Sequence, residues 1–364
     1  MKKLLCLLLT ALLLLSLAGC KTASQDPENP GASEESTGST ETGTETADTT
    51  ESSQNQQEEI PATKTLYFCT EEAFTDSYGG STTVRTYDEH GNLLTQNYKS
   101  NSGDDAFNEA YTYDESGNVL TYKSYDKYSG LTKETTYTYN DADQLVSQLF
   151  TSKEDAFSHT EKSDFTYRED GLLIKKVATD PADPGNEVHF IYSYDDNSNL
   201  IKEEWINVND GVQTPHSWKA WTYDEKGNKL SETDNRGFRT EWTYDDRGNM
   251  LSEEQYNDRG DYWKGVTYTY DKQNRVLTES FTKDAPSAVS EAFIYEYDNN
   301  GHEIARYRCY DAVDKAKAVR VFKSTYDEFG NKVSEICCTP EGEETTWRYY
   351  KYIAIELPNQ QKES

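Results

Sequence analysis

The sequence predicts an all-β protein in which about ten two-stranded hairpins follow one another as a long antiparallel meander. Three observations predict this class. An eight-residue pattern, first seen as "YDEHGNLL" at Tyr87, occurs ten times along the chain. Each copy carries turn residues flanked by apolar residues with a period of two, which is typical of a hairpin. The copies lie 21 to 29 residues apart, and this period indicates a repeat architecture rather than separate domains.

The turn of each hairpin is predicted by two positions of the pattern. Asp follows the tyrosine in eight copies, and Gly stands three places further on in seven copies. Asp favours the start of a type I turn, and Gly adopts the left-handed conformation that ends it. Asp143, Ser198 and Asn274 replace the Gly in the other copies; Asp and Asn best tolerate that conformation without glycine. The tyrosines that begin the ten copies are Tyr87, Tyr113, Tyr139, Tyr167, Tyr194, Tyr223, Tyr244, Tyr270, Tyr297 and Tyr326.

The strands are predicted by what flanks the turn. Two residues before the tyrosine, the eight inner copies carry an aromatic residue, such as Trp221 before Tyr223. A spacing of two places both rings on one face of a strand. Seven residues after the tyrosine stands an aliphatic residue in every copy, and a second turn signal follows in most copies, as in "TDNRG". Each repeat is therefore predicted to contain two strands and two turns.

How the hairpins assemble depends on their register. If the tyrosine pairs with the residue six later, the aliphatic residue lies on the opposite face, whereas a one-residue slip places both on one face. A flat sheet of about twenty strands would leave a large apolar face in water, so we expect a sheet twisted or coiled into an open shell. The end copies carry Arg85 and Ser324 where the inner copies have a ring, which indicates polar caps on an open array. Residues Thr345–Leu357 are expected to form a closing strand pair.

The first twenty residues predict a lipoprotein signal peptide. Lys2 and Lys3 precede an apolar run that ends in "LAGC", and this order is typical of a cleaved secretory signal. The Leu-Ala-Gly-Cys ending resembles the bacterial lipobox, which implies cleavage before Cys20 and lipid attachment to its sulfur. The expected location is the extracytoplasmic face of a bacterial cell membrane, with the membrane as a partner through the N-terminal lipid.

The remaining boundaries follow from composition. Residues 21–63 contain ten acidic residues against Lys21 alone and no apolar periodicity, so they are expected to form a disordered tether. Such a tether would span roughly 35–40 Å. The predicted organisation is therefore a signal peptide at 1–20, a tether at 21–63, a repeat domain at 64–357 and a disordered tail at 358–364. The net charge of −30 excludes nucleic acid as a partner, because a phosphate backbone requires a basic surface.

The repeat resembles the YD repeat of RHS-type proteins, the family that includes bacterial RHS proteins and teneurins. The resemblance is clearest in "TDNRGFRTEWTYDDRGNML", and it covers residues 84–340. It implies hairpins that wind into a β-shell. In large RHS proteins this shell encloses a toxin, and nothing in this chain after the last copy is long enough to be one. The residues of the clearest copy that match the family pattern are Gly237, Trp242, Tyr244, Asp245, Gly248 and Leu251.

The sequence contains no pattern that predicts catalysis or a cofactor. The five histidines lack metal-ligand spacing, and no serine or cysteine stands in the context of a nucleophile. The Asp-x-x-Gly turns lack the closing Glu of a calcium loop. We therefore expect no enzyme activity, no cofactor and no metal. Cys309 and Cys338 fall in the same column of neighbouring repeats, two strands apart in a meander, so we expect both to be free thiols.

The aromatic content leaves binding as the predicted function. Aromatic residues make up 13% of the chain, and exposed Tyr and Trp bind sugars or peptides through rigid amphipathic rings. We expect a non-catalytic binding or adhesion module for a glycan, a cell-wall component or a surface protein. The alternative is a passive envelope lipoprotein without a ligand; three or more rings in one exposed patch would favour binding. The candidate ligand-binding rings outside the paired columns are Trp205, Trp218, Tyr262, Trp263 and Trp347.

Overall fold

The computed structural model describes residues 63–76, 79–100, 104–154, 157–310, 312–339, 341 and 343–358. Within these ranges all regular structure is β-strand. The predicted signal peptide, Cys20 and nearly all of the tether and tail lie outside the described residues. Thr63 and Pro358, which were assigned to the tether and the tail, are the first and last residues of strands.

The described residues form 22 strands of 6 to 15 residues. In chain order they are β1 (Thr63–Asp76), β2 (Gly79–Tyr87), β3 (Leu93–Ser100), β4 (Asp105–Tyr113), β5 (Val119–Asp126), β6 (Thr132–Tyr139), β7 (Leu145–Glu154), β8 (Phe157–Tyr167), β9 (Leu173–Asp180), β10 (Asp183–Tyr194), β11 (Leu200–Asn209), β12 (Val212–Tyr223), β13 (Lys229–Asp234), β14 (Arg239–Tyr244), β15 (Met250–Tyr256), β16 (Tyr262–Tyr270), β17 (Val276–Lys283), β18 (Val289–Tyr297), β19 (Glu303–Tyr310), β20 (Val319–Tyr326), β21 (Lys332–Cys338) and β22 (Glu344–Pro358).

The chain divides into two compact units. Of the described residues, the smaller unit contains only 63–68 and 354–358, which are the outer ends of β1 and β22. The larger unit runs from Cys69 to Ile353 and contains the rest of these two strands and all the others.

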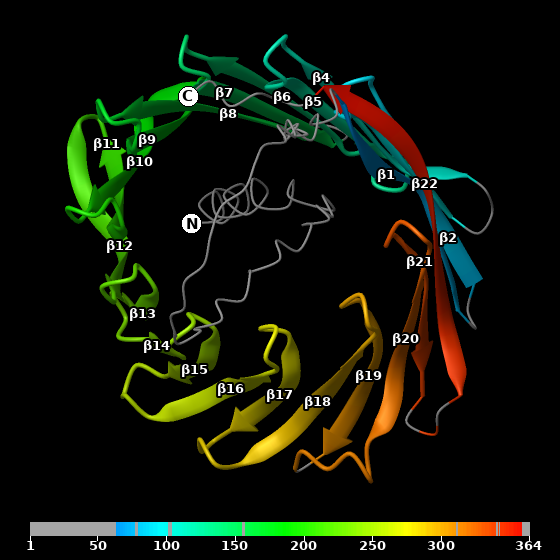
Figure 1. The fold of residues 1–364 in the computed structure, drawn as a ribbon. Helices are drawn as coiled ribbons and strands as arrows, with labels where there is room; N and C mark the ends of the chain where they lie inside the picture. Colours follow the sequence, from blue (N-terminus) through cyan, green and yellow to red (C-terminus); the bar gives the residue numbers. More distant parts are fainter. Residues whose placement is uncertain are drawn as a thin grey trace, which may run out of the picture. The chain divides into compact units, whose positions relative to one another are not determined.

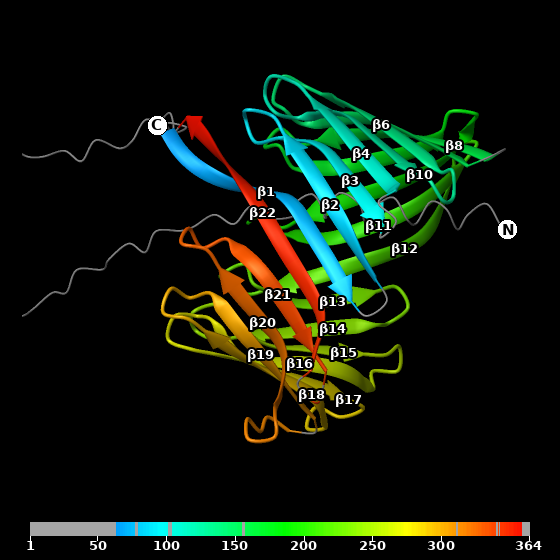
Figure 2. The same ribbon diagram turned by 90° about the vertical axis from the view of Figure 1, so that its right-hand side faces the viewer.

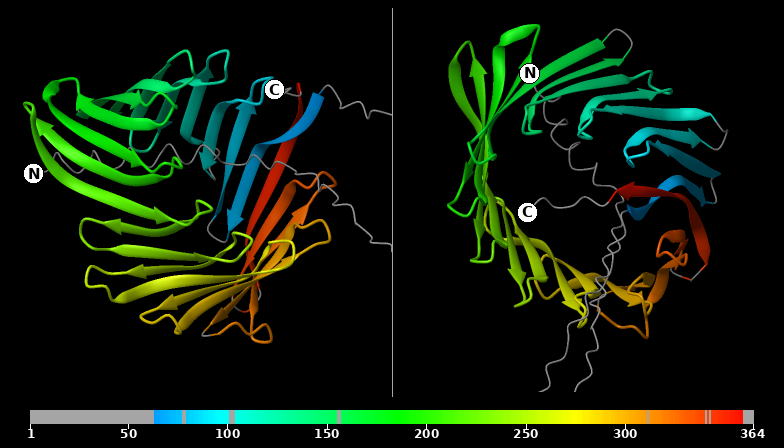
Figure 3. Two further views of the ribbon diagram at one scale, coloured as in Figure 1. Left: turned by 60° about the vertical axis from the view of Figure 1, so that its left-hand side comes forward. Right: turned by 45° about the horizontal axis from the view of Figure 1, so that its top comes forward.

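The larger unit is a closed antiparallel barrel, so the prediction of an open shell-like sheet is wrong. Each strand pairs antiparallel with the next along the chain, and β22 pairs with β1 (Figures 1 and 2). Figure 3 shows the same ring of strands from two further directions. At the seam, Thr70 Oγ1 donates a hydrogen bond to the carbonyl oxygen of Lys351 at 3.2 Å, and Lys351 Nζ lies 2.7 Å from Glu71 Oε1. Closure satisfies the backbone groups that two free sheet edges would expose.

Closure also overturns the interpretation of the end copies as caps. Arg85 in β2 donates to Gln96 Oε1 in β3 at 2.7 Å and reaches Glu72 in β1 at 3.4 Å. Ser324 in β20 is buried, and β20 pairs with both β19 and β21. Each residue therefore has neighbouring strands on both sides. Residues Thr345–Leu357 belong to the single strand β22 rather than to a strand pair.

The predicted turn chemistry is confirmed in detail. At the first copy, Asp88 Oδ1 accepts the N–H groups of His90 and Asn92 at 2.9 and 2.8 Å, and Asp88 Oδ2 accepts Asn92 Nδ2 at 3.0 Å. The Gly91 N–H closes the turn onto the Asp88 carbonyl at 3.1 Å, with φ at 81°. The residues that replace this glycine in other copies also have positive φ values: Asp143, Ser198 and Asn274. The Asp carboxylate is thus satisfied by its own turn.

Of the two registers considered, the structure has the one in which the tyrosine pairs with the residue six later. Tyr87 lies opposite Leu93, and Thr86 lies opposite Thr95, so Leu94 is the extra residue of a β-bulge. The same shift recurs in the other copies. Seven aliphatic residues at this position are exposed by 36 to 39%: Leu94, Leu120, Ile201, Leu230, Leu251, Leu277 and Ile304.

The tyrosine column joins each hairpin to the one before it. Tyr223 Oη donates to the carbonyl oxygen of Leu200 in the preceding repeat at 2.7 Å. All ten tyrosines make this bond, at 2.7 to 3.0 Å, and Tyr352 in β22 repeats it with Lys332 at 2.9 Å. We call these bonds the tyrosine clasps. They give the tyrosine hydroxyl a hydrogen bond that phenylalanine could not make.

The cysteines agree with the meander. Cys309 lies in β19 and Cys338 in β21, with β20 paired between them. Both are free thiols, as predicted.

Candidate functional site

The aromatic column lies in the barrel wall and is hydrogen-bonded to a row of glutamates. Trp221 Nε1 donates to Glu232 at 2.7 Å, and Trp242 Nε1 donates to Glu253 at 3.1 Å. Tyr295 Oη bonds Glu279 in the same way at 2.8 Å. The polar group of each of these rings is therefore used within the wall, which indicates a structural role for the column.

A groove lies where the repeat is shortest. The spacing of 21 residues between Tyr223 and Tyr244 leaves β13 and β14 with six residues each. Their neighbours are β12, with 12 residues, and β15, with seven. At this short hairpin is a groove of about 340 Å³. We call it the hairpin groove, and its lining residues are Lys219, Glu232, Asp234, Arg236, Phe238, Arg239, Thr240, Gln255, Tyr256 and Trp263.

Three aromatic rings line the hairpin groove. Phe238 is 37% exposed and Trp263 is 48% exposed, while Tyr256 is half-buried. A cation lies over each ring: Arg236 over Phe238 at 5.0 Å, Arg239 over Tyr256 at 4.4 Å and Lys264 over Trp263 at 4.9 Å. These contacts orient the rings and place positive charge beside them. A cationic ligand is therefore disfavoured here.

The polar residues of the groove are arranged in ion pairs. Lys219 Nζ lies 2.7 Å from Glu232 Oε1, and Arg236 Nη2 lies 2.6 Å from Asp234 Oδ2. Burial alone would raise the pKa of Glu232, but hydrogen bonds from Lys219 and Trp221 outweigh it and hold that pKa below its usual value. Burial likewise raises the pKa of Asp234, but the hydrogen bonds from Arg236 outweigh it, and the pKa of Asp234 is lowered as well. Both carboxylates are thus ionised acceptors at neutral pH.

The arrangement has the chemistry of a sugar-binding surface. Exposed rings offer apolar faces to the C–H side of a sugar ring, and polar groups beside them meet hydroxyls. Thr240 and Gln255 add a hydroxyl and an amide to the paired charges of the groove. Among the described residues there is no cluster of His, Cys, Asp and Glu that could hold a metal ion.

The structure brings two of the five predicted rings to this groove. Trp263 lines it, and Tyr262 packs edge-on against Tyr256 with ring centroids 5.8 Å apart. The Tyr262 hydroxyl bonds to Thr282.

The other three predicted rings lie elsewhere. Trp205 in β11 lies opposite Ser217, so Trp218 in β12 lies on the other face of the wall. Trp205 Nε1 donates to Glu203 at 2.7 Å, and Trp347 in β22 donates to Glu344 at 3.3 Å.

Two rings of the groove, Phe238 and Tyr256, are not among the residues that the sequence predicted. Neither belongs to the tyrosine column or to the aromatic column two residues before it. The sequence signal that indicates this groove is the short spacing of this copy, because shortened strands beside longer ones form a depression in a sheet.

The chain matches no family model and no curated protein. Among solved structures it is similar to the crystal structure of TcdB2-TccC3-Cdc42, with 13% identity, a TM-score of 0.31, and coverage of 78% of this chain and 18% of that one. It is also similar to the Photorhabdus luminescens Tc holotoxin pore, with 14% identity, a TM-score of 0.31, and coverage of 74% and 16%. A porin-like protein from Bacteroides uniformis matches with 13% identity, a TM-score of 0.28, and coverage of 78% and 96%.

The chain therefore spans about a fifth of the length of the first of these proteins. Similarity at these TM-scores carries no argument about function. No helix among the described residues is long and apolar enough to cross a membrane.

Proposed function

We propose that this protein is a lipid-anchored, non-catalytic binding module of the YD-repeat type on the extracytoplasmic face of a bacterial membrane. Its barrel binds a glycan, such as a cell-wall polysaccharide, in the hairpin groove. The single observation that carries the proposal is the presence of three rings, Phe238, Tyr256 and Trp263, in one groove with ion-paired polar groups. Phe238 and Trp263 are exposed and Tyr256 is half-buried, so the groove supports the proposal with two exposed rings and one partly covered ring.

The anchor follows from the N-terminal sequence. The "LAGC" ending at Cys20 supports lipid attachment, and the acidic segment behind it supports a spacer of roughly 35–40 Å between membrane and barrel. Charged side chains lie on both faces of the wall, as in the pairs Lys123–Glu134 and Lys219–Glu232. A barrel embedded in lipid requires an apolar outer band instead, so the proposed barrel stands clear of the bilayer on its tether.

The test is titration calorimetry of the full-length protein in detergent with a panel of cell-wall glycan fragments. Trp263→Ala should weaken binding at least about tenfold, because burying a large apolar side chain contributes about 1.5–3 kcal/mol. Trp218→Ala is the matched control, because Trp218 is similarly exposed, at 37%, and lies outside the groove. Equal losses in the two variants would contradict the assignment of the site.

A second candidate is a passive envelope lipoprotein without a ligand. It is favoured by the column rings Trp221 and Trp242, whose N–H groups are used inside the wall. If neither glycan fragments nor cell-surface proteins bind the intact protein, this candidate replaces the first.

A further inference from the structure

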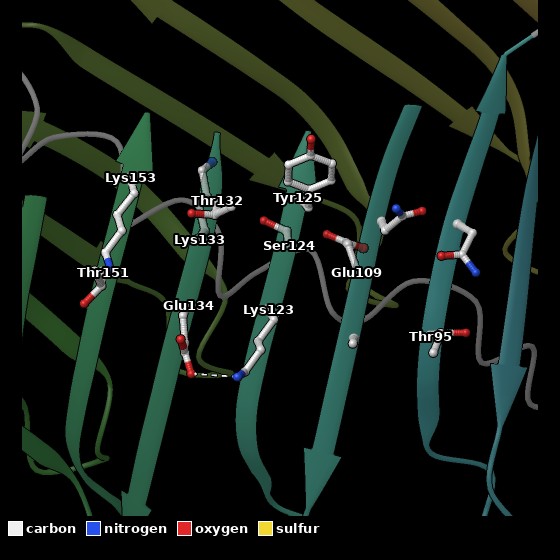
Figure 4. A pocket seen from close by; sticks show the side chains of 13 residues that line it. Thr95, Glu109, Lys123, Ser124, Tyr125, Thr132, Lys133, Glu134, Thr151 and Lys153 are labelled. Atoms are coloured by element: carbon white, nitrogen blue, oxygen red, sulfur yellow. Dashed lines mark ion pairs between the residues drawn. The ribbon is translucent and has the colours of Figure 1, made fainter. Parts of the chain in front are cut away.

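A second concave surface crosses β3 to β7, well separated along the chain from the hairpin groove. It is a shallow trough of about 680 Å³ (Figure 4). The register places one row of side chains directly across the five strands. Each residue of this row lies opposite the next: Asn97, Asn108, Tyr125, Thr132 and Lys153. At about 4.8 Å per strand the row is roughly 19 Å long, which suits an extended ligand.

A second row runs beside the first, two residues along each strand. Its members, again each opposite the next, are Thr95, Ala110, Lys123, Glu134 and Thr151. Ala110 provides a low point in the floor because its side chain is small. Lys123 Nζ and Glu134 Oε1 form an ion pair at 3.0 Å, marked in Figure 4.

The first row has unused hydrogen-bonding capacity. None of its five side chains makes a hydrogen bond or an ion pair with another side chain or backbone group among the described residues. Asn108 Oδ1 is buried and still has no donor. A buried acceptor without a partner costs free energy, and a ligand donor satisfies this oxygen once the Asn108 side chain turns toward the trough. The Trp and Tyr column of the opposite face differs, since its polar groups are bonded to glutamates.

The charge and the ring of the trough define the ligand class. The two rows carry two lysines and one glutamate, and Lys153 forms no ion pair with any acidic residue that the structure describes. Their local charge is therefore positive on a chain of net charge −30. Tyr125 is 44% exposed and offers a ring face on which a sugar ring can stack. An acyclic phosphate polymer would leave that ring face unused.

We propose that the trough is a second binding site, separate from the hairpin groove, for an extended acidic polysaccharide. A sugar ring stacks on Tyr125, hydroxyl groups bond to Asn97, Asn108 and Thr132, and a uronate carboxylate pairs with Lys153. At physiological ionic strength the screening length is about 8 Å. The distant acidic residues of the chain then oppose this ligand only weakly.

The experiment is titration of the full-length protein with a uronate tetrasaccharide and a neutral tetrasaccharide at about 0.15 M salt. The uronate ligand should bind more tightly. Lys153→Gln should weaken it about two- to fivefold, as expected for one exposed ion pair, and Tyr125→Ala should weaken it further. Lys283→Gln is the matched control, because Lys283 is exposed in β17 and lines neither groove; it should bind as the unmodified protein does.

Three results would overturn the proposal. The neutral tetrasaccharide could bind equally well, Lys153→Gln and Tyr125→Ala could leave affinity unchanged, or polyphosphate could compete as well as the uronate. Trp263→Ala separates the two sites, because it should leave uronate binding intact. If Trp263→Ala lost uronate binding while Lys153→Gln and Tyr125→Ala kept it, the acidic ligand would bind in the hairpin groove and not in the trough.

Discussion

The tyrosine clasps make a quantitative prediction about stability. Tyr223→Phe keeps the ring and removes only the hydroxyl that donates to the Leu200 carbonyl at 2.7 Å. A hydrogen bond of this kind contributes about 0.5–1.5 kcal/mol net. For a barrel of this size, 1 kcal/mol corresponds to a fall in Tm of about 2 °C. The Tm of the single variant, followed by circular dichroism, should fall by about this amount.

The effect should grow with the number of clasps removed. Four clasps belong to hairpins that are not adjacent along the chain and bond four different carbonyls, so their effects should add. They are made by Tyr113, Tyr167, Tyr223 and Tyr270. Changing all four to Phe should cost about 4 kcal/mol and lower the Tm by about 8 °C. Tyr128→Phe is the control, because Tyr128 is 72% exposed. If the fourfold variant has the same Tm as the Tyr128→Phe control, the clasps do not stabilise the barrel.

Two further predictions concern alkaline pH and the membrane anchor. Burial raises the pKa of Tyr139 to about 12, and a hydrogen bond to Glu254 together with burial does the same for Tyr256. Since tyrosine in an unfolded chain has a pKa of about 10, this stability is complete below about pH 10 and is lost as the pH rises through 12. Tm measured against pH should therefore fall in that window; a flat profile would contradict the raised pKa values. Cys20→Ser should release the protein from the membrane fraction, and continued membrane association would refute the lipid anchor.

The local parts of the fold could be predicted because each is set by residues close together in sequence. The Asp88 turn and the left-handed residues such as Asp143 each depend on one short segment. The sequence left two registers open, and the structure has the one that pairs Tyr87 with Leu93. The closure of the barrel could not be predicted from the sequence, because it depends on the pairing of β1 with β22. Neither strand contains the eight-residue pattern, and Thr70 and Lys351 at the seam are 281 residues apart.

Only part of the candidate site could be predicted from the sequence, because its rings come together across several strands. Trp263 could be selected because it stands outside the repeated columns. Phe238 and Tyr256 could not, because their proximity to Trp263 depends on β14, β15 and β16 lying side by side next to a shortened hairpin. The trough required the register across five strands to be known at once.

The central claim is that the hairpin groove binds a glycan, and hydrogen–deuterium exchange tests it most directly. Exchange should be compared between the full-length protein alone and the protein saturated with the tightest glycan of the panel. The proposal predicts slower exchange in 234–239 and 262–264, around Phe238 and Trp263, with no change in β19 to β21. Protection confined to other strands, or no protection at saturation, would contradict it.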